Sequence, residues 1–405
     1  MYEFITNLNK NEYEEFVFHN NKSHFMQSYN WGKIQTNKNI KPYYVGLKKD
    51  NKLVASALIL EKKILKNIGY MYSPRGFILD YKNEELIKKF STYLKKFTKE
   101  NNNIFLRIDP DLNIKEYEYL IELLNKNKFK HKGFNKNFEN NQPRYTFRLN
   151  INKSIEEVYK CFHPTTRKIL NKGNQFDLEI YKGNSNDIDD FYKTMIDTGI
   201  RENIKPSKKE YYKTFYEIFN KNNNSDIYIV KVDINKLKDK YNILIKNIEK
   251  EIDKIKNQEQ KNKAKSENTI NDLTNKINKM NKELEEINSI KEEKIVLSSI
   301  ITAKYNDKVW TVHGGNNNNL RFLNANYLLY YEIIKDAVKE NYKIIDFFGT
   351  TGNPTPDNPI YGIHLFKQRL GGDYTEFIGE FDYVNKKLLY FLYNKYLDYK
   401  KKRKN

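Results

Sequence analysis

Cysteine is almost absent from this chain of 405 residues, in which Cys161 is the only one. A single cysteine can form neither an intramolecular disulfide nor a thiolate metal cluster. Long apolar runs are also missing: no stretch of about 18 apolar residues occurs, and the N-terminal MYEFITNLNKNEYEEF lacks the apolar segment of a signal peptide. We therefore expect a cytoplasmic protein whose membrane contact, if any, is peripheral at the inner face of the plasma membrane.

Acidic side chains are outnumbered, with 52 Asp and Glu against 72 Lys and Arg, which gives a formal net charge of +20. Such a field favours nucleic acid, anionic lipid headgroups or a phosphorylated substrate. A lysine-rich, solvated surface is the alternative. The histidines show no metal-ligand spacing such as H-E-x-x-H, so we expect no metal and no cofactor.

Strand and helix patterns alternate along most of the chain. Tyr43–Lys48 and Leu53–Glu61 have the composition of two strands joined by a turn, and Glu84–Lys99 has apolar residues at helical spacing. Ile104–Ile108 reads as a short buried strand. A similar cycle follows residue 150, so the pattern predicts a duplicated α/β (α+β) architecture of two or three domains.

One segment differs from both halves, because its apolar residues recur every three or four positions. The series includes Leu237, Tyr241 and Ile248, and it resumes with Ile270 and Ile277 after a polar interval. This pattern indicates an antiparallel coiled-coil hairpin. Four lysines lie near its tip: Lys256, Lys261, Lys263 and Lys265. They suit an RNA backbone, but most coiled coils act as spacers or dimerisation arms, and that alternative stays open.

Short motifs in the first half resemble those of the Fem family of peptidoglycan-bridge aminoacyltransferases. Gln27–Lys33 (QSYNWGK) is similar to the family's Q-S-x-x-W-G-x segment, and Tyr72–Phe77 (YSPRGF) resembles its Y-x-P-R-G-P turn. Leu106–Asp111 (LRIDPD) matches its strand-ending I-D-P motif. The second half carries further matches, namely Trp310–Gly315 (WTVHGG), Asn326–Leu329 (NYLL), Ile345–Gly349 (IDFFG) and Tyr361–Lys367 (YGIHLFK) followed by Gly371-Gly372.

The resemblance implies two tandem GNAT-like acyl-CoA N-acyltransferase domains with the hairpin inserted in the second. We expect the first domain at residues 1–150 and the second at 151–233 and 296–385. The hairpin would occupy 234–295, and a C-terminal helix with a basic tail 386–405. The usual acyl-CoA pyrophosphate loop, Q/R-x-x-G-x-G/A, is absent, which argues against acetyl-CoA as donor.

The resemblance also implies a reaction, the transfer of an amino acid from aminoacyl-tRNA to a stem-peptide amine of a peptidoglycan precursor. Glycine is the expected residue, with serine and alanine close behind. The acceptor would be lipid II or a UDP-muropeptide, through the side-chain amine of its third stem residue or through a residue already added there. An ester donor is already activated, so the enzyme needs positioning and oxyanion stabilisation rather than a covalent nucleophile.

Two residues are the expected catalytic groups. Lys367, from the F-K motif, would stabilise the oxyanion or the leaving ribose oxygen, although a surface lysine beside Gln368 and Arg369 is the alternative. Asp109 would orient the acceptor amine and accept its proton, although an Asx turn that ends the strand is an alternative. Phe366 and Tyr327 would help to bind the substrate.

Cations would bind the diphosphate of the precursor. Lys33 and Arg201 are the candidates, each of which could instead be a plain surface cation. Arg75 would support the same cleft or order its own turn. His313 stands where the family has tyrosine, and it would contact the acceptor or be structural.

Two other functions remain open. One is an acyl-CoA-dependent N-acyltransferase, and the other is a non-catalytic module that binds RNA or a membrane through the hairpin.

Overall fold

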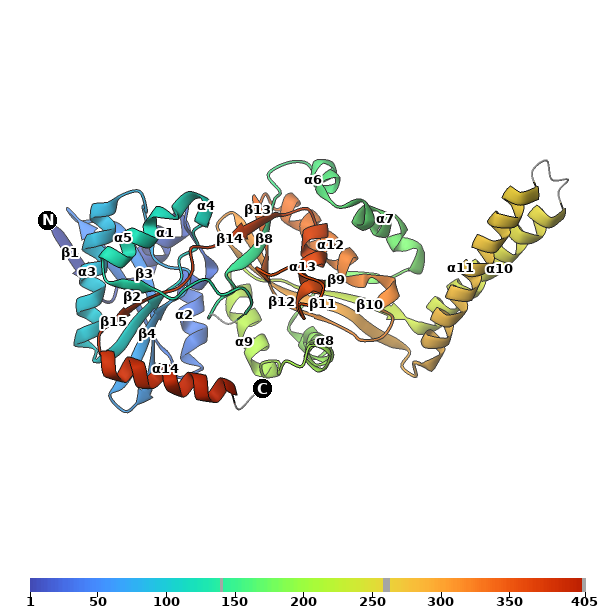
Figure 1. Ribbon diagram of the computed structural model, residues 1–405. Coiled ribbons are helices and arrows are strands. Elements are labelled where there is room, and N and C mark those ends of the chain that lie inside the picture. Colours follow the sequence, from blue (N-terminus) through green and yellow to red (C-terminus); the bar gives the residue numbers. More distant parts are fainter. Residues whose placement is uncertain (139–140, 258–262, 403–405) are drawn as a thin grey trace.

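The computed structural model describes residues 1–138, 141–257 and 263–402. Figure 1 shows two domains side by side, each built on one mixed sheet, and a helical hairpin that projects from the second domain. The two tandem α/β domains and the inserted hairpin confirm the expected GNAT-like fold class.

The first sheet contains β1 (Tyr2–Ile5), β2 (Lys41–Lys49), β3 (Lys52–Leu65), β4 (Ile68–Ser73), β5 (Ile78–Leu79), β6 (Asn103–Ile108), β7 (Phe129–His131) and β15 (Phe381–Val384). Helices α1 (Lys10–Phe18), α2 (Tyr29–Thr36), α3 (Glu84–Glu100), α4 (Ile114–Tyr117) and α5 (Tyr119–Lys126) accompany it, with a 3-10 turn at Phe25–Gln27. The predicted strands and the α3 helix are therefore present.

The second sheet contains β8 (Tyr145–Asn150), β9 (Glu179–Gly183), β10 (Ile227–Asp233), β11 (Lys294–Tyr305), β12 (Lys308–Asn316), β13 (Ile344–Thr350) and β14 (Asp373–Glu376). Its helices are α6 (Ile155–Cys161), α7 (Pro164–Lys172), α8 (Ile188–Arg201), α9 (Lys209–Asn220), α12 (Ala325–Lys339) and α13 (Tyr361–Arg369). Short 3-10 turns lie at Gly173–Phe176, Ser185–Asp187 and Arg321–Leu323. Helix α14 (Lys387–Lys402) follows β15.

The two-residue period of β3 shows why helices cover both faces of the first sheet. Leu58 and Leu60 pack in one cluster with α1 and α2, whereas Ala57 and Ile59 pack in another with α3 and α5. A strand with apolar residues on both faces has to be buried on both. Helix α3 begins where the side chain of Asn83 accepts a hydrogen bond from the Leu86 amide at 2.9 Å.

The two sheets have the same layout. The first runs β1-β2-β3-β4-β6-β15-β7 and the second runs β9-β10-β11-β12-β13-β8-β14. In each, an antiparallel meander is followed by one parallel pair, β4 with β6 and β12 with β13. Helices α3 and α12 connect these parallel strands, as a parallel pair requires a crossover.

Each domain donates one strand to the other. Strand β8 follows β7 in the chain, yet it pairs with β13 and β14 of the second sheet. Strand β15 follows β14, yet it pairs with β6 and β7 of the first sheet. The domain boundaries expected at residues 150 and 385 therefore differ from the strand pairing. Strand β8 belongs to the second sheet, and β15 belongs to the first. Residue patterns identify a strand, but its neighbours are fixed by long-range pairing.

The two domains also share an apolar core. Phe25 lies 5.1 Å from Trp310 and 6.1 Å from Phe219, measured between ring centroids. In addition, Tyr305 donates a hydrogen bond to Glu14 at 2.9 Å. A shared aromatic core together with exchanged strands holds the two domains in a fixed relation.

The hairpin consists of α10 (Ile234–Asn257) and α11 (Lys263–Ser289), inserted between the paired strands β10 and β11. Its predicted seam is present: Leu237, Tyr241, Ile248 and Met280 are buried. Tyr241 also donates a hydrogen bond to Glu283 across the hairpin at 3.0 Å. Because β10 and β11 are neighbours, the insertion leaves the sheet intact.

Candidate functional site

The parallel strands β12 and β13 separate partway along their length and open a cleft. They pair from Lys308 and Ile344 as far as Trp310 and Asp346. Beyond that point β12 remains paired with β11, and β13 remains paired with β8. A cavity of about 530 Å³ occupies the opening, which we call the β12–β13 cleft. Its lining includes Arg201, Tyr327, Phe366 and Lys367.

Lys367 is nearly buried in this cleft, with 8% of its surface exposed. Its ammonium donates hydrogen bonds to the carbonyls of Phe348 at 3.2 Å and Gly349 at 2.5 Å. Phe348 has a φ of 60°, so two successive carbonyls face one side chain, whereas in a regular strand they alternate. Burial lowers the pKa of Lys367 to about 7, although Asp346 nearby opposes the shift. This amine therefore exchanges a proton near neutral pH.

Phe366 and Tyr327 form an aromatic wall of the same cleft. Their ring centroids lie 4.7 Å apart in an edge-to-face arrangement, and Tyr330 lies 4.9 Å from Phe366. Phe366 thus belongs to the apolar core and to the cleft at once.

Arg201 lines the cleft with partners already in place. Its guanidinium donates to Glu202 at 2.9 Å and to the side chain of Asn318 at 2.6 Å. A phosphate at this position would have to share the charge with Glu202.

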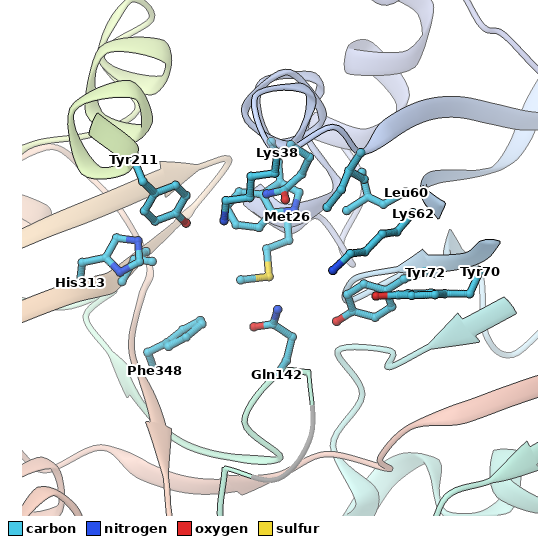
Figure 2. Close-up of a pocket in the computed structure, with 14 residues that line it drawn as sticks. Met26, Lys38, Leu60, Lys62, Tyr70, Tyr72, Gln142, Tyr211, His313 and Phe348 are labelled. Carbon is cyan, nitrogen blue, oxygen red and sulfur yellow. The ribbon is translucent and has the colours of Figure 1, made fainter. Parts of the chain in front are cut away.

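A second cavity, of about 300 Å³, lies between the domains (Figure 2). Lys38 and Lys62 from the first domain point into it, facing Tyr211 and His313 from the second. Burial, and next the neighbouring charge of Lys62, lower the pKa of Lys38. Lys38 also lies 3.9 Å above the ring of Tyr211. We call this space the interdomain cavity, and its two lysines give it a positive interior.

His313 lies at the wall of the interdomain cavity among aromatic rings. Its centroid is 5.1 Å from Tyr212, 5.3 Å from Phe215 and 5.6 Å from Tyr211. Burial, followed by the charge of Lys38, lowers the pKa of His313 to about 3, so the imidazole is neutral. Its Nε2 has no hydrogen-bond partner among the residues that the structure describes. A polar group of a substrate could fill that place.

Asp109 sits behind the interdomain cavity rather than in its wall. It is 3% exposed and accepts hydrogen bonds from the Arg75 amide at 2.8 Å and from the Tyr72 hydroxyl at 3.0 Å. Tyr72 itself lines the cavity. Burial raises the pKa of Asp109 to about 7, with Arg75 opposing the shift and Glu380 adding to it. The carboxyl therefore reaches the cavity through the Tyr72 hydroxyl.

Arg75 is held by contacts outside its own turn. Its guanidinium donates to the Pro143 carbonyl at 2.6 Å and lies 4.4 Å from the centre of the Phe377 ring. It lines a narrow space of about 10 Å³ that it shares with Arg148, Asp346 and Phe348. Arg75 thus supports the junction between the domains.

Arg148 connects the two strand-end motifs across that junction. It donates to Asp111 at 2.7 and 2.8 Å and to Asp346 at 2.8 Å. The Arg148 charge holds the pKa of Asp111 well below its usual range, against the effect of burial. Asp111 follows Asp109 in the first domain, whereas Asp346 faces Lys367 in the second, so one guanidinium fixes both halves of the site.

The structure brings together some of the expected residues and separates others. Lys367, Phe366, Tyr327 and Arg201 share the β12–β13 cleft, whereas His313 and, through Tyr72, Asp109 belong to the interdomain cavity. Val312 and Phe348 line both spaces, so the two cavities meet there. Lys33 is exposed and lies outside these linings. Lys38, five residues further on, lines the interdomain cavity.

Sequence patterns missed several of the lining residues. Tyr72 stands in a quoted motif, YSPRGF, so its position carried a signal. Lys38, Lys62 and Tyr211 carried none, because lysine and tyrosine are common throughout the chain. Lys256, Lys263 and Lys265 are exposed near the tip of the hairpin, and Lys261 lies outside the described residues. Figure 1 shows the hairpin pointing away from both sheets.

Within the described ranges, no group of His, Cys, Asp or Glu has the arrangement of a metal site. Across the same ranges, no helix is long and apolar enough to cross a membrane.

A tandem pair of GNAT-like domains with a cleft between parallel strands defines an acyltransferase fold. The model of the FemAB family matches residues 8–397, and the chain belongs to this family. A lipid II:glycine glycyltransferase of Staphylococcus haemolyticus is 27% identical over 394 residues, which cover 95% of this chain and 93% of that protein. The protein of the same name from Staphylococcus aureus MRSA252 is 27% identical over 94% of this chain and 92% of its own. The crystal structure of FemX is 26% identical, with a TM-score of 0.77, and covers 96% of this chain and 99% of that one.

Proposed function

We propose that this chain transfers glycine from glycyl-tRNA to a side-chain amine of the stem peptide of lipid II, building a peptidoglycan cross-bridge. The acceptor and the amino acid follow the names of the relatives from Staphylococcus haemolyticus and Staphylococcus aureus. The tRNA donor rests on the motifs, on the hairpin and on the ester chemistry that the site suits.

One observation carries the proposal. The interdomain cavity and the β12–β13 cleft have Val312 and Phe348 in common, so two substrates that enter separately meet at one place. Bringing an amine and an activated ester together accounts for much of the acceleration that such a reaction needs. We assign the precursor to the interdomain cavity, because Lys38 and Lys62 suit its diphosphate. The aminoacyl end of the tRNA then belongs in the cleft beside Lys367.

The proposed chemistry uses two groups whose pKa values lie near neutrality. The acceptor nitrogen attacks the ester carbon, the new C–N bond forms, and the C–O bond to the ribose oxygen breaks. The amine gives its proton to the Tyr72 oxygen while Tyr72 passes its own proton to Asp109. Lys367 stabilises the oxyanion and donates a proton to the ribose oxygen. Exchange with solvent then restores Asp109 and Lys367.

The role of the Phe348 and Gly349 carbonyls follows from this assignment. They accept hydrogen bonds from the ammonium of Lys367 at 3.2 and 2.5 Å, and so fix where its charge lies. A nearly buried charge that is already held in place costs little reorganisation during the reaction.

A transfer assay tests the donor. Purified protein is incubated with lipid II and with tRNA pools charged with one radiolabelled amino acid at a time. Label from glycyl-tRNA in the lipid product supports the proposal, and Lys367→Ala serves as the control that should abolish it. Label from none of the pools would reject aminoacyl transfer, and the acyl-CoA alternative would then be tested by direct binding of acyl-CoA.

A further inference from the structure

Helix α14 has one face packed on the first domain and one apolar face exposed. On the packed face, the rings of Tyr390 and Tyr393 lie 5.4 and 5.5 Å from Phe105. The large side chains that are more than half exposed on the other face include Leu388 at 71%, Phe391 at 53%, Leu392 at 52% and Tyr396 at 56%. The outer face of a surface helix is normally polar. This cluster therefore needs a partner.

The end of β3, just before its turn into β4, adds two more exposed apolar residues beside this helix. Ile64 is 42% exposed and Leu65 is 64% exposed. The turn is tied to the start of α14, because Asn102 donates to the Asn67 carbonyl at 2.8 Å and accepts a hydrogen bond from Lys386. Figure 1 shows α14 lying along the edge of the first domain, next to the blue β3–β4 turn. Helix and turn thus form one surface.

Cations surround the apolar side chains of this surface. Lys395 lies 4.7 Å from the centre of the Phe391 ring, and Lys400 lies 5.7 Å from that of Tyr396. Lys63 and Lys66 flank Ile64 and Leu65 in the sequence. Asp398 is the acidic residue on this part of the helix. Apolar side chains within a basic rim are the arrangement of a helix that lies in the interface of an anionic bilayer.

We propose that this surface, which we call the membrane face, docks the protein on an anionic lipid bilayer. It consists of Ile64, Leu65, Leu388, Phe391, Leu392 and Tyr396. Helix α14 lies parallel to the bilayer, its apolar side chains reach the boundary between headgroups and acyl chains, and the lysines contact lipid phosphates. Because α14 is already packed on the domain, docking needs no folding of a disordered segment and no loss of backbone entropy.

The membrane face adjoins the interdomain cavity, which gives the docking a purpose that rests on the proposed function. Tyr70 lines that cavity, and its ring lies 5.7 Å from Tyr393 of α14. Lys62, which also lines the cavity, lies on β3 close to Ile64 and Leu65 in the sequence. A precursor whose diphosphate lies at the bilayer surface could therefore reach Lys38 and Lys62 while its lipid stays in the membrane.

Flotation with vesicles tests the docking without any need for activity. The full chain is mixed with vesicles of phosphatidylcholine alone and of phosphatidylcholine with phosphatidylglycerol. We expect binding to the anionic vesicles that weakens as salt is raised. The variant L388E/L392E should bind roughly a hundredfold less, on the order of tenfold for each leucine withdrawn from the apolar boundary. The matched control is Ile243→Glu, at a helical residue on the hairpin that is 55% exposed.

The outcomes separate the two proposals. Equal flotation of the wild type and L388E/L392E, or no flotation of the wild type, would overturn the membrane face. Binding that is lost only in L388E/L392E would support it even if no transfer activity were found. With transfer established, the same variant should lose activity on lipid II in vesicles and keep it on the soluble UDP-muropeptide. Equal loss on both acceptors would contradict a role in docking.

Discussion

The hydroxyl of Tyr72 donates a hydrogen bond to Asp109 at 3.0 Å, and it is Tyr72 rather than Asp109 that lines the interdomain cavity. The Asp109 carboxyl therefore reaches an acceptor amine in the cavity through the Tyr72 hydroxyl. This arrangement places the proposed proton acceptor in a dry environment, where its pKa is raised to about 7 by burial.

Replacement of Tyr72 by phenylalanine should remove this connection while leaving the ring in place. We expect kcat/KM for transfer to fall by about a hundredfold, the usual effect of losing a proton-transfer group. Tyr70→Phe is the matched control, because Tyr70 lines the same cavity while its ring stacks on Phe105 at 5.0 Å. If both variants lost activity equally, the cavity wall rather than the hydroxyl would be responsible.

The rate of transfer should depend on pH through both buried groups. Asp109 must be ionised to accept a proton, so kcat/KM should rise as the pH passes about 7. Lys367 must be protonated to donate one, so the rate should fall above about 7. The profile is therefore a narrow bell centred near neutrality. Asp109→Asn should lower the rate and remove the limb on the acid side, and a wild-type rate that stays flat between pH 5 and 9 would contradict both assignments.

The buried Asp109 should affect stability in the opposite direction: ionisation favours transfer but lowers the free energy of unfolding. Its pKa is about 7 in the folded chain against an ordinary value of 3.8, so the folded state binds the proton more tightly. The contribution is present in full below about pH 4 and is lost as the pH rises towards 7. Chemical denaturation between pH 4 and 7 should show a free energy of unfolding that falls with pH less steeply in Asp109→Asn than in the wild type. An identical slope in the variant would show that Asp109 titrates normally.

Removal of Arg148 should lower the free energy of unfolding strongly, because its guanidinium lies between two carboxylates. Arg148→Met leaves Asp111 and Asp346 without their shared partner, at a cost of about 3–5 kcal/mol in the free energy of unfolding. Lys33→Met, at an exposed residue, should change it by less than about 0.5 kcal/mol. Urea titration of both variants measures the difference, and similar values would mean that the Arg148 pairs contribute little.

The tip of the hairpin should matter for the donor alone. Changing Lys256, Lys263 and Lys265 to glutamate should raise KM for glycyl-tRNA at least tenfold. The KM for the acceptor should stay unchanged. The same change at Lys88, Lys96 and Lys99 on α3 is a control of equal charge. An unchanged KM in the tip variant would leave the hairpin as a spacer or a dimerisation arm.

Sequence patterns predicted most of the elements but not how two of them pair. The seam from Leu237 to Ile287 gave the hairpin directly, because a coiled coil is specified by local spacing. Strands β8 and β15, at 145–150 and 381–384, were not identified from the sequence, and each belongs to the sheet of the other domain. Only the packing of distant segments decides such an exchange.

Residues of the candidate site that belong to short motifs could be predicted from the sequence. Residues that only the fold brings together could not. Lys367 and Phe366 stand in one motif and line one cleft. Lys38 and Lys62 belong to no motif, and they become a pair only because the turn after α2 and the strand β3 face the same cavity. The role of Tyr72 likewise depends on the 3.0 Å contact with Asp109, which no sequence spacing encodes.

The central claim is tested most directly by locating the transferred residue on the product. Protein, glycyl-tRNA and lipid II are incubated, and the released muropeptide is sequenced by tandem mass spectrometry, with Lys367→Ala in parallel. We predict one glycine in amide linkage on the side-chain amine of the third stem residue, absent with the variant. A muropeptide that stays unmodified with well-folded protein, or one that Lys367→Ala modifies equally, would contradict the account.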